Sequence, residues 1–361
     1  MPLSAPPRFH TLTIRDVRRE TPDAVSIAFD VPPELAGAYA YEPGQYLTLR
    51  ATLDGAEVRR SYSICSGPEE RELRIGVKRV ENGAFSTFAN EVMQAGHAVD
   101  VMTPTGRFGR VAQTEEGRTY GGFAAGSGIT PILSIVRGVL AREPDSRFFL
   151  FYGNRSMADM LFRTALEELK DRHLGRFSVF HVLSQEEQDV SVLNGRLDAA
   201  KAKLLLTHIV PASVVDHVFI CGPLGMSEGV EAACAELGIE PGRVHVERFV
   251  SEFGGRSRAK PATAALGAPS RTAALIADGK RREVPVRDGE SVLDAALRAG
   301  FDLPYACKGG MCSTCRAKVV EGAVAMDLNY SLEPWETEAG FVLTCQAHPT
   351  TARVVIDYDQ L

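Results

Sequence analysis

The first part of the chain alternates apolar and polar side chains with a period of two. This period, which is typical of half-buried β-strands, recurs over residues 25–31, 47–51 and 73–77. Only residues 85–94 have the spacing of a helix, and Gly96 is placed to end it. Short alternating strands with one helix predict a small antiparallel β-barrel domain over residues 1–112.

The pattern changes after residue 112 to apolar strands that alternate with helices. Strands are expected at 119–125, 147–152, 176–183, 217–221 and 243–246, and helices at 132–140, 158–172 and 224–237. This alternation predicts an α/β domain with a parallel sheet over residues 113–250. Such a sheet binds ligands at the carboxyl ends of its strands.

Residues 251–269 are rich in glycine, alanine, serine and proline and have no amphipathic period. We expect a linker there, either a mobile tether that spans roughly 20–25 Å or a segment packed along the surface. In residues 270–361, strands are expected at 273–277, 283–286, 317–320 and 353–356, with a helix at 292–299. That order predicts an α+β domain of the β-grasp type.

Composition and charge narrow the class of protein. A chain of 361 residues implies several domains, and its 45% hydrophobic content is ordinary for a globular protein. The net charge of −6 argues against nucleic-acid binding and suits a basic patch on a protein partner. No apolar run is long enough for a membrane span, and the N-terminus lacks a signal-peptide core. Seven cysteines without the pattern of a disulfide framework lead us to expect a reducing cytoplasm.

Four cysteines near the C-terminus have the spacing of metal ligands. The pattern C-x4-C-x2-C is followed 30 residues later by a fourth cysteine, and the four are Cys307, Cys312, Cys315 and Cys345. This is the ligand set of a plant-type [2Fe–2S] cluster. Gly309 and Gly310 supply the positive φ that so tight a loop needs. The other readings are a four-cysteine zinc site and buried thiols without a ligand.

Three stretches of the barrel domain also carry chemistry. Residues 60–63 place a charge, an aromatic ring and two hydroxyls in one strand, residues 82–87 open the predicted helix, and residues 103–109 form a rigid turn. The N–H groups at a helix start can hold a phosphate. Taken singly, the first stretch also fits a surface strand and the second an ordinary helix cap.

The α/β domain has a glycine-rich turn at 126–131, between a strand and a helix. Glycines there let a pyrophosphate approach the helix N–H groups, so we expect a nucleotide site. Residues 153–156 and 221–223 end two further strands and should lie at the same edge of the sheet. Arg155 and Arg196 favour the 2′-phosphate of NADPH over NADH, whereas Gln185 counts against it.

Together, the barrel stretches resemble the FAD-binding domain of the ferredoxin–NADP reductase superfamily. The resemblance implies that Arg60 binds the FAD pyrophosphate and that Tyr62 stacks on the isoalloxazine. It also places Ser63 at the N5 edge of the flavin.

The same resemblance gives Lys78 and Ser86 a share in holding the FAD phosphates. Asn82 stands where the family often has a glycine. Because asparagine tolerates the left-handed backbone region better than most residues, this departure weakens the match only slightly.

The turn at 126–131 and the C-G-P-x-x-M segment at 221–226 resemble the pyridine-nucleotide domain of that superfamily. The residues that this likeness brings to the nicotinamide are Gly126, Gly128, Thr130 and Cys221. Met226 would support the segment, and Phe249 would lie near the flavin. From the residues alone, Cys221 also fits a small buried apolar side chain.

The domain order of FAD, pyridine nucleotide and C-terminal ferredoxin resembles reductases that serve oxygenases. This resemblance implies that electrons pass from NADPH to FAD, then to the [2Fe–2S] cluster and on to a partner. It also implies that Ser63 and Cys221 position flavin N5 and nicotinamide C4. Four stretches resemble the reductase subunit of a di-iron oxygenase, which would be the electron acceptor; they are residues 152–156, 245–249, 303–322 and 329–349. Two alternatives remain. The acceptor could be another oxygenase or a desaturase, or the protein could be a zinc-stabilised scaffold without catalysis.

Overall fold

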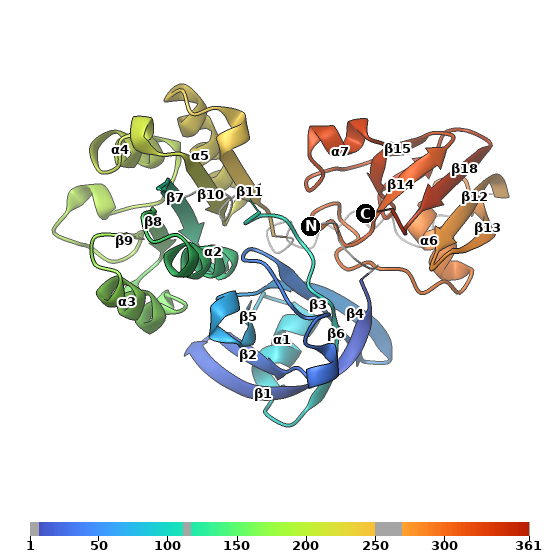
Figure 1. The fold of residues 1–361 in the computed structure, drawn as a ribbon, viewed down its shortest axis with the longest axis horizontal. Coiled ribbons are helices and arrows are strands. Elements are labelled where there is room, and N and C mark those ends of the chain that lie inside the picture. The colour runs from blue at the N-terminus through green and yellow to red at the C-terminus, as the bar shows by residue number, and fades with distance from the viewer. Residues whose placement is uncertain (1–6, 111–116, 250–268, 361) are drawn as a thin grey trace. The chain divides into compact units, whose positions relative to one another are not determined.

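The computed structural model describes residues 7–110, 117–249 and 269–360. The chain forms two compact units (Figure 1). One unit holds most of the predicted barrel domain and the nucleotide domain, and the other holds the C-terminal domain together with Phe9 and residues 59–61. Apart from residue 269, the predicted linker at 251–269 lies outside the described residues.

Six strands form the first domain. They are β1 (Phe9–Thr21), β2 (Ala24–Asp30), β3 (Tyr46–Leu53), β4 (Ala56–Ser63), β5 (Leu73–Lys78) and β6 (Ala98–Met102). Their order is β4-β3-β6-β1-β2-β5, with antiparallel pairing of β1 with β2, β2 with β5 and β3 with β6. A bridge between Ile64 and Ile75 joins the two edges of the sheet, which closes it into the predicted barrel. Helix α1 (Ala84–Glu91) packs into the core of this barrel through Phe85 and Ala89.

The hydrophobic pattern does not reveal β1 or β6. β1 carries a run of charged residues, and its register with β2 shifts twice, so its inward positions do not follow a strict period of two. β6 is only five residues long, which is too short for its alternation to stand out. Helix α1 is also shorter than predicted, because it ends at Glu91 instead of residue 94.

The second domain is the predicted parallel α/β sheet. Its strands are β7 (Thr119–Ala125), β8 (Arg147–Asn154), β9 (Phe177–Leu183), β10 (His217–Cys221) and β11 (Val244–Glu247), in the order β11-β10-β7-β8-β9. Its helices are α2 (Ile129–Arg142), α3 (Arg163–Arg172), α4 (Ala199–His208) and α5 (Leu224–Glu236). Helices α2 and α3 belong to one core cluster and α4 and α5 to the other, so helices cover both faces of the sheet.

Two helices of this domain differ from the prediction. α3 begins five residues later than expected, because a short 3-10 turn (Met157–Asp159) precedes it and Phe162 takes a left-handed φ of 58°. α4 was not predicted. Only Ala202, Leu205 and Leu206 of this helix are buried, and its other positions mix apolar and polar residues, so the sequence shows no clear amphipathic period.

Helix α2 is apolar on nearly all sides because it packs between the parallel sheet and the barrel. Its Ser134 hydroxyl donates to the carbonyl of Ser66, 2.7 Å away. Its Gly138 faces Pro43, and a Cβ there would lie 2.5 Å from Pro43 Cγ. The barrel and the nucleotide domain thus share a continuous core, which positions the ends of β4 and β10.

The C-terminal unit is a β-grasp domain. Its main sheet has the order β13-β12-β18-β14-β16, built from β12 (Pro269–Ala277), β13 (Lys280–Arg287), β14 (Arg316–Glu321), β16 (Phe341–Leu343) and β18 (Arg353–Asp357). Two short strands, β15 (Val324–Met326) and β17 (Ala347–Pro349), pair separately. Helix α6 (Val292–Arg298) covers the sheet and helix α7 (Pro334–Glu338) precedes β16. The loop with the first three candidate cysteine ligands runs between α6 and β14.

Candidate functional site

The four predicted cysteine ligands lie in the C-terminal unit as two pairs. The Sγ atoms of Cys307 and Cys312 are 3.2 Å apart. The thiol of Cys315 hydrogen-bonds to Cys345, whose sulfur also accepts from Nε2 of Gln346 at 3.5 Å. In each pair one pKa falls and the other rises: the neighbouring thiol lowers the pKa of Cys307 and of Cys345, and raises that of Cys312 and of Cys315.

This pairing tests the two metal readings. A zinc site needs four ligands around one ion, whereas a [2Fe–2S] cluster takes two thiolates on each of its two irons. Within residues 7–110, 117–249 and 269–360, no three cysteine, histidine, aspartate or glutamate side chains converge on the position of one metal ion. The two pairs of thiols match the two-by-two ligand set of the cluster.

The cluster loop has the tight backbone that its sequence predicts, with one change of residue. Gly310 takes a φ of 73°, and a Cβ there would lie 2.9 Å from the carbonyl oxygen of Leu328. Lys308, not Gly309, takes the second left-handed conformation, with a φ of 49°. The N–H groups of Gly309 and Cys312 donate to the Cys307 sulfur at 3.3 and 3.4 Å, which stabilises a thiolate there.

The start of α1 has the form of a phosphate site. Asn82 takes a left-handed φ of 59°, as expected for a residue in a glycine position. A Cβ on Gly83 would lie 2.5 Å from the Ser86 hydroxyl, so only glycine fits there. Ser86 itself is buried and fixes this turn, accepting from the Val80 N–H and donating to the Gly83 carbonyl.

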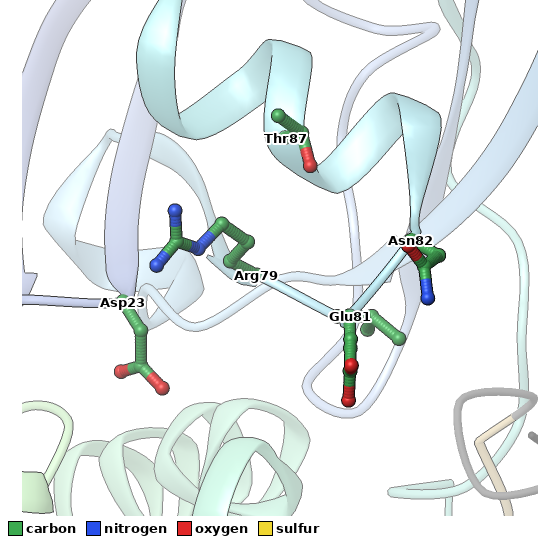
Figure 2. A pocket seen from close by; sticks show the side chains of 6 residues that line it. Asp23, Arg79, Glu81, Asn82 and Thr87 are labelled. Carbon is green, nitrogen blue, oxygen red and sulfur yellow. The ribbon is translucent and has the colours of Figure 1, made fainter.

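A surface pocket of about 390 Å³ lies against this turn. Arg79, Asn82 and Thr87 line it with Asp23, Val80 and Glu81 (Figure 2). The Lys78 ammonium contacts Asp23 at 3.5 Å, so Lys78 lies beside the same pocket. Arg79 and the Thr87 hydroxyl could hold a phosphate there, although the carboxylates of Asp23 and Glu81 also line the pocket. Sequence reasoning did not single out Arg79.

The strand β4 presents the predicted FAD residues in order. Arg60 is exposed, and its guanidinium donates to the carbonyl of Arg59. Tyr62 is half-buried, with its ring centroid 5.8 Å from that of Phe85 in α1. Ser63 is buried at the end of the strand. Within one unit, the Tyr62 and Ser63 side chains thus run from a half-buried to a buried position.

Ser63 and Cys221 lie on either side of a residue that sequence reasoning did not single out, Glu247. The Ser63 hydroxyl donates to Glu247 Oε2 at 3.2 Å. Glu247 pairs with Cys221 in the register of β10 and β11, and the Cys221 side chain is fully buried. Burial raises the pKa of Glu247 to about 8, against a smaller lowering by the Ser63 hydrogen bond.

The glycine-rich turn meets the end of β10 as predicted. Gly126 takes a φ of 53°, and a Cβ on Gly128 would lie 2.0 Å from the Cys221 carbonyl oxygen. That close approach requires glycine. The Thr130 hydroxyl donates to the Ser127 carbonyl at 2.9 Å, and its methyl group packs at Gly76 of β5. Thr130 therefore stabilises the turn and the joint with the barrel.

Met226 and Phe249 are placed as supports. Met226 is buried, and its Cε would be 2.7 Å from a Cβ on Gly222, so it packs on the segment after Cys221. Phe249 is half-buried and packs against the core cluster that includes Cys221.

The two candidate arginines for a 2′-phosphate lie on neighbouring loops. The N–H of Gln185 donates to the Arg155 carbonyl at 2.8 Å, and the N–H of Gly195 donates to the Leu183 carbonyl at 2.7 Å. Arg155 and Arg196 are both exposed, at the carboxyl edge of β8 and β9. Asp159 binds the Arg155 guanidinium at 2.6 Å and Glu186 accepts from the Met157 N–H, so this corner also holds two carboxylates.

Three family matches follow the same order as the domains. Residues 11–109 match the oxidoreductase FAD-binding domain, residues 123–232 the oxidoreductase NAD-binding domain, and residues 275–350 the 2Fe-2S iron-sulfur cluster binding domain. The chain is thus a flavin- and iron–sulfur-dependent oxidoreductase of the ferredoxin–NADP reductase superfamily, as the sequence predicts.

Full-length relatives define the family more closely. The chain is 46% identical to a subunit of 1,2-phenylacetyl-CoA epoxidase from Escherichia coli (strain K12), over 97% of this chain and 98% of that protein. It is 34% identical to the ferredoxin reductase component of 3-ketosteroid-9-alpha-monooxygenase from Mycobacterium tuberculosis (strain CDC 1551 / Oshkosh), covering 97% and 96%. The structure of phthalate dioxygenase reductase is similar at a TM-score of 0.57 and 25% identity, covering 97% and 98%. The chain belongs to this family of three-module oxygenase reductases.

Among the residues that the structure describes, no helix is both long and apolar enough to cross a membrane.

Proposed function

We propose that the protein is an NADPH-dependent reductase that supplies electrons to a di-iron epoxidase acting on phenylacetyl-CoA. The observation that carries this proposal is the 46% identity to a subunit of 1,2-phenylacetyl-CoA epoxidase, which extends over 97% of this chain. The match covers all three modules, and therefore both the entry and the exit of electrons.

Bound flavin would convert the hydride of a nicotinamide into single electrons that an iron–sulfur cluster can carry. The residues of this chain would bind and orient these groups. Arg60, Lys78 and Ser86 would hold the FAD phosphates, aided by Arg79 and by the N–H groups at the start of α1. Tyr62 would stack on the isoalloxazine, for which its half-buried ring is suited.

Ser63, Cys221 and Glu247 would form the hydride-transfer site. Ser63 would lie at the N5 edge of the flavin, and the buried Cys221 would exclude water beside the nicotinamide. Because its pKa is raised to about 8, Glu247 would hold a proton on its carboxyl at neutral pH and keep the site free of a negative charge. Gly126, Gly128 and Thr130 would shape the nicotinamide end, with Met226 and Phe249 in support.

Ser63→Ala tests this site. We expect slower flavin reduction in stopped flow and a normal FAD content, because Ser63 acts on the reaction and not on the phosphates. Arg60→Ala is the matched comparison, for which FAD content should fall. Flavin reduction at the wild-type rate in Ser63→Ala would contradict the role.

NADPH is proposed over NADH because two exposed arginines lie at the carboxyl edge of β8 and β9, where a 2′-phosphate would bind. Asp159 neutralises part of the charge of Arg155, so Arg196 would carry more of the preference. We expect Arg196→Ala to raise the KM for NADPH and to leave the KM for NADH unchanged. A wild-type preference of about tenfold or more for NADH would overturn the assignment.

Cys307, Cys312, Cys315 and Cys345 would hold the cluster in the exit domain. The boundaries 1–112, 113–250, 251–269 and 270–361 remain our proposed modules, with the linker as a tether. We also propose that the protein works in a reducing cytoplasm, because its cysteines lack the pattern of a disulfide framework.

Reconstitution tests the acceptor. Purified reductase, NADPH and the catalytic subunits of the epoxidase should convert phenylacetyl-CoA. The matched assay uses the oxygenase component of a 3-ketosteroid monooxygenase, to whose reductase the chain is less similar. Faster turnover with the steroid enzyme would favour that acceptor class instead.

A further inference from the structure

An exposed segment of the C-terminal unit lies directly against the cluster loop. The N–H of Tyr330 donates to the Gly310 carbonyl at 3.0 Å. The carbonyl of Leu328 lies so close to Gly310 that a Cβ there would be 2.9 Å away. Gly310 stands between the ligands Cys307 and Cys312. The segment around 327–338 is therefore in contact with the loop that would bind the cluster, from which electrons would leave the protein.

Three large apolar side chains in this segment are exposed. The exposed fraction is 44% for Leu328, 36% for Tyr330 and 53% for Trp335. Large apolar side chains that are exposed close together often mark interaction surfaces. Tryptophan and tyrosine are also enriched among the residues that contribute most to binding at protein interfaces. Trp335 is the one tryptophan of the chain.

The segment is also acidic. Residues 319–352 contain five aspartates and glutamates and no lysine or arginine. Four of the five are exposed, and three of these four, Asp327, Glu333 and Glu338, lie in the segment around 327–338. We call the six exposed side chains Asp327, Leu328, Tyr330, Glu333, Trp335 and Glu338 the acidic–aromatic surface. A surface with an apolar centre and a negative rim fits a partner whose surface has apolar side chains surrounded by basic ones.

The backbone under this surface is held in place. The Asn329 side chain bonds to Leu332 through both its amide atoms, at 2.9 and 3.0 Å. The buried carboxylate of Glu336 in α7 contacts the buried guanidinium of Arg316 at 2.7 Å, and Arg316 follows the ligand Cys315. A surface fixed in this way loses little conformational entropy when it binds a partner.

We propose that the acidic–aromatic surface is the docking site of the electron-accepting oxygenase subunit. The inference rests on the proposed function and names the surface that it uses. Contact with the cluster loop would bring the acceptor close to the donor of electrons. The occupant carries a basic rim; a second copy of this chain does not fit, because its own net charge is −6.

The test measures the KM for the epoxidase with Trp335→Ala and Glu338→Lys. Leu174→Ala and Glu240→Lys are the matched controls, because these residues are an exposed apolar side chain and an exposed carboxylate in the nucleotide domain. Both surface variants should raise the KM about tenfold or more, and Glu338→Lys should also weaken its salt dependence. Ferricyanide reduction and the visible spectrum of the cluster should not change in either variant.

A direct signal is available because the chain has one tryptophan. With 5-fluorotryptophan at Trp335, the single fluorine resonance should shift or broaden when the epoxidase is added, and recover at high salt. An unchanged KM in both surface variants, or an unperturbed resonance in a mixture that turns over, would overturn the proposal.

The reductase's own flavin module is the other possible occupant. Slower reduction of the cluster by NADPH in Trp335→Ala, with a normal KM for the epoxidase, would show that the surface serves that module and would overturn the proposal. If the wild-type protein drives no epoxidase turnover at all, it is the proposed function that fails. In that case the surface can still be tested with the oxygenase that the wild type does reduce, because the variants should bind that oxygenase more weakly than the wild type does.

Discussion

Replacing Glu247 with glutamine removes an ionisation from the proposed hydride-transfer site without changing its size. In the structure the Glu247 carboxyl accepts a hydrogen bond from Ser63 at 3.2 Å and stands beside Cys221 in the parallel sheet. Burial raises its pKa from the ordinary 4.5 to about 8. Glutamine keeps the acceptor oxygen for Ser63 and cannot ionise.

The size of this perturbation can be worked out from the pKa. A change from 4.5 to about 8 corresponds to about 5 kcal/mol between the two protonation states. Because the folded-state pKa is the higher one, the stabilising effect is complete below about pH 4.5 and is lost as the pH rises through about 8. The free energy of unfolding of wild type should therefore fall over this range by up to about 5 kcal/mol relative to Glu247→Gln.

The assay is stopped-flow reduction of the flavin by NADPH between about pH 6 and 9.5. A carboxylate formed above pH 8 opposes the arrival of a hydride, so the wild-type rate should fall there, whereas the rate of Glu247→Gln should stay level. Ser63→Ala should move the fall to higher pH, because the Ser63 hydrogen bond lowers this pKa. A fall near pH 8 that persists in Glu247→Gln would refute the assignment.

Three further predictions concern the stability of the separate domains. Gly310→Ala should lose the cluster on purification, because alanine in the left-handed φ destabilises the loop by at least about 1–2 kcal/mol. Gly309→Ala is the control: its Cβ would meet nothing closer than 3.7 Å, so this variant should retain the visible spectrum of the cluster. Glu336→Ala should lower the free energy of unfolding of the C-terminal unit, measured in urea, by about 3–5 kcal/mol, because it leaves the charge of Arg316 buried without a partner carboxylate. The double variant Arg316→Met/Glu336→Leu should recover most of this loss. Equal stability of the single and double variants would count against this prediction. Burial lowers the pKa of His245 from 6.5 to about 4, so the nucleotide domain should lose about 3 kcal/mol as the pH falls from 6.5 to 4, and in His245→Phe this part of the acid sensitivity should be absent.

The parts of the site that could be predicted are those whose chemistry is local in sequence. The cysteine spacing, the glycines at 126 and 128 and the helix start after Asn82 each depend on a few consecutive residues. The structure gives Gly128 a carbonyl neighbour that admits no side chain, and it gives Asn82 the left-handed φ of a glycine position.

The parts that could not be predicted depend on distant contacts or on irregular backbone. Glu247 is 184 residues from Ser63, and nothing in the local pattern of β11 marks its carboxyl as different from any other. β1 hides its strand period behind shifts of register, and Phe162 delays α3 by taking a left-handed φ. In the cluster loop, two adjacent glycines are the obvious candidates for positive φ, but Lys308 takes the second one, next to the Gly309 N–H that donates to the Cys307 sulfur.

In the proposed function, electrons from NADPH reach the oxygenase through the cysteine-bound cluster. The most direct measurement compares Cys312→Ala with Cys234→Ala, a buried cysteine of α5 outside the site, in NADPH-driven turnover of the epoxidase and in ferricyanide reduction. We expect Cys234→Ala to support both reactions, and Cys312→Ala to keep ferricyanide reduction and lose epoxidase turnover. Epoxidase turnover by Cys312→Ala at the wild-type rate would contradict the account.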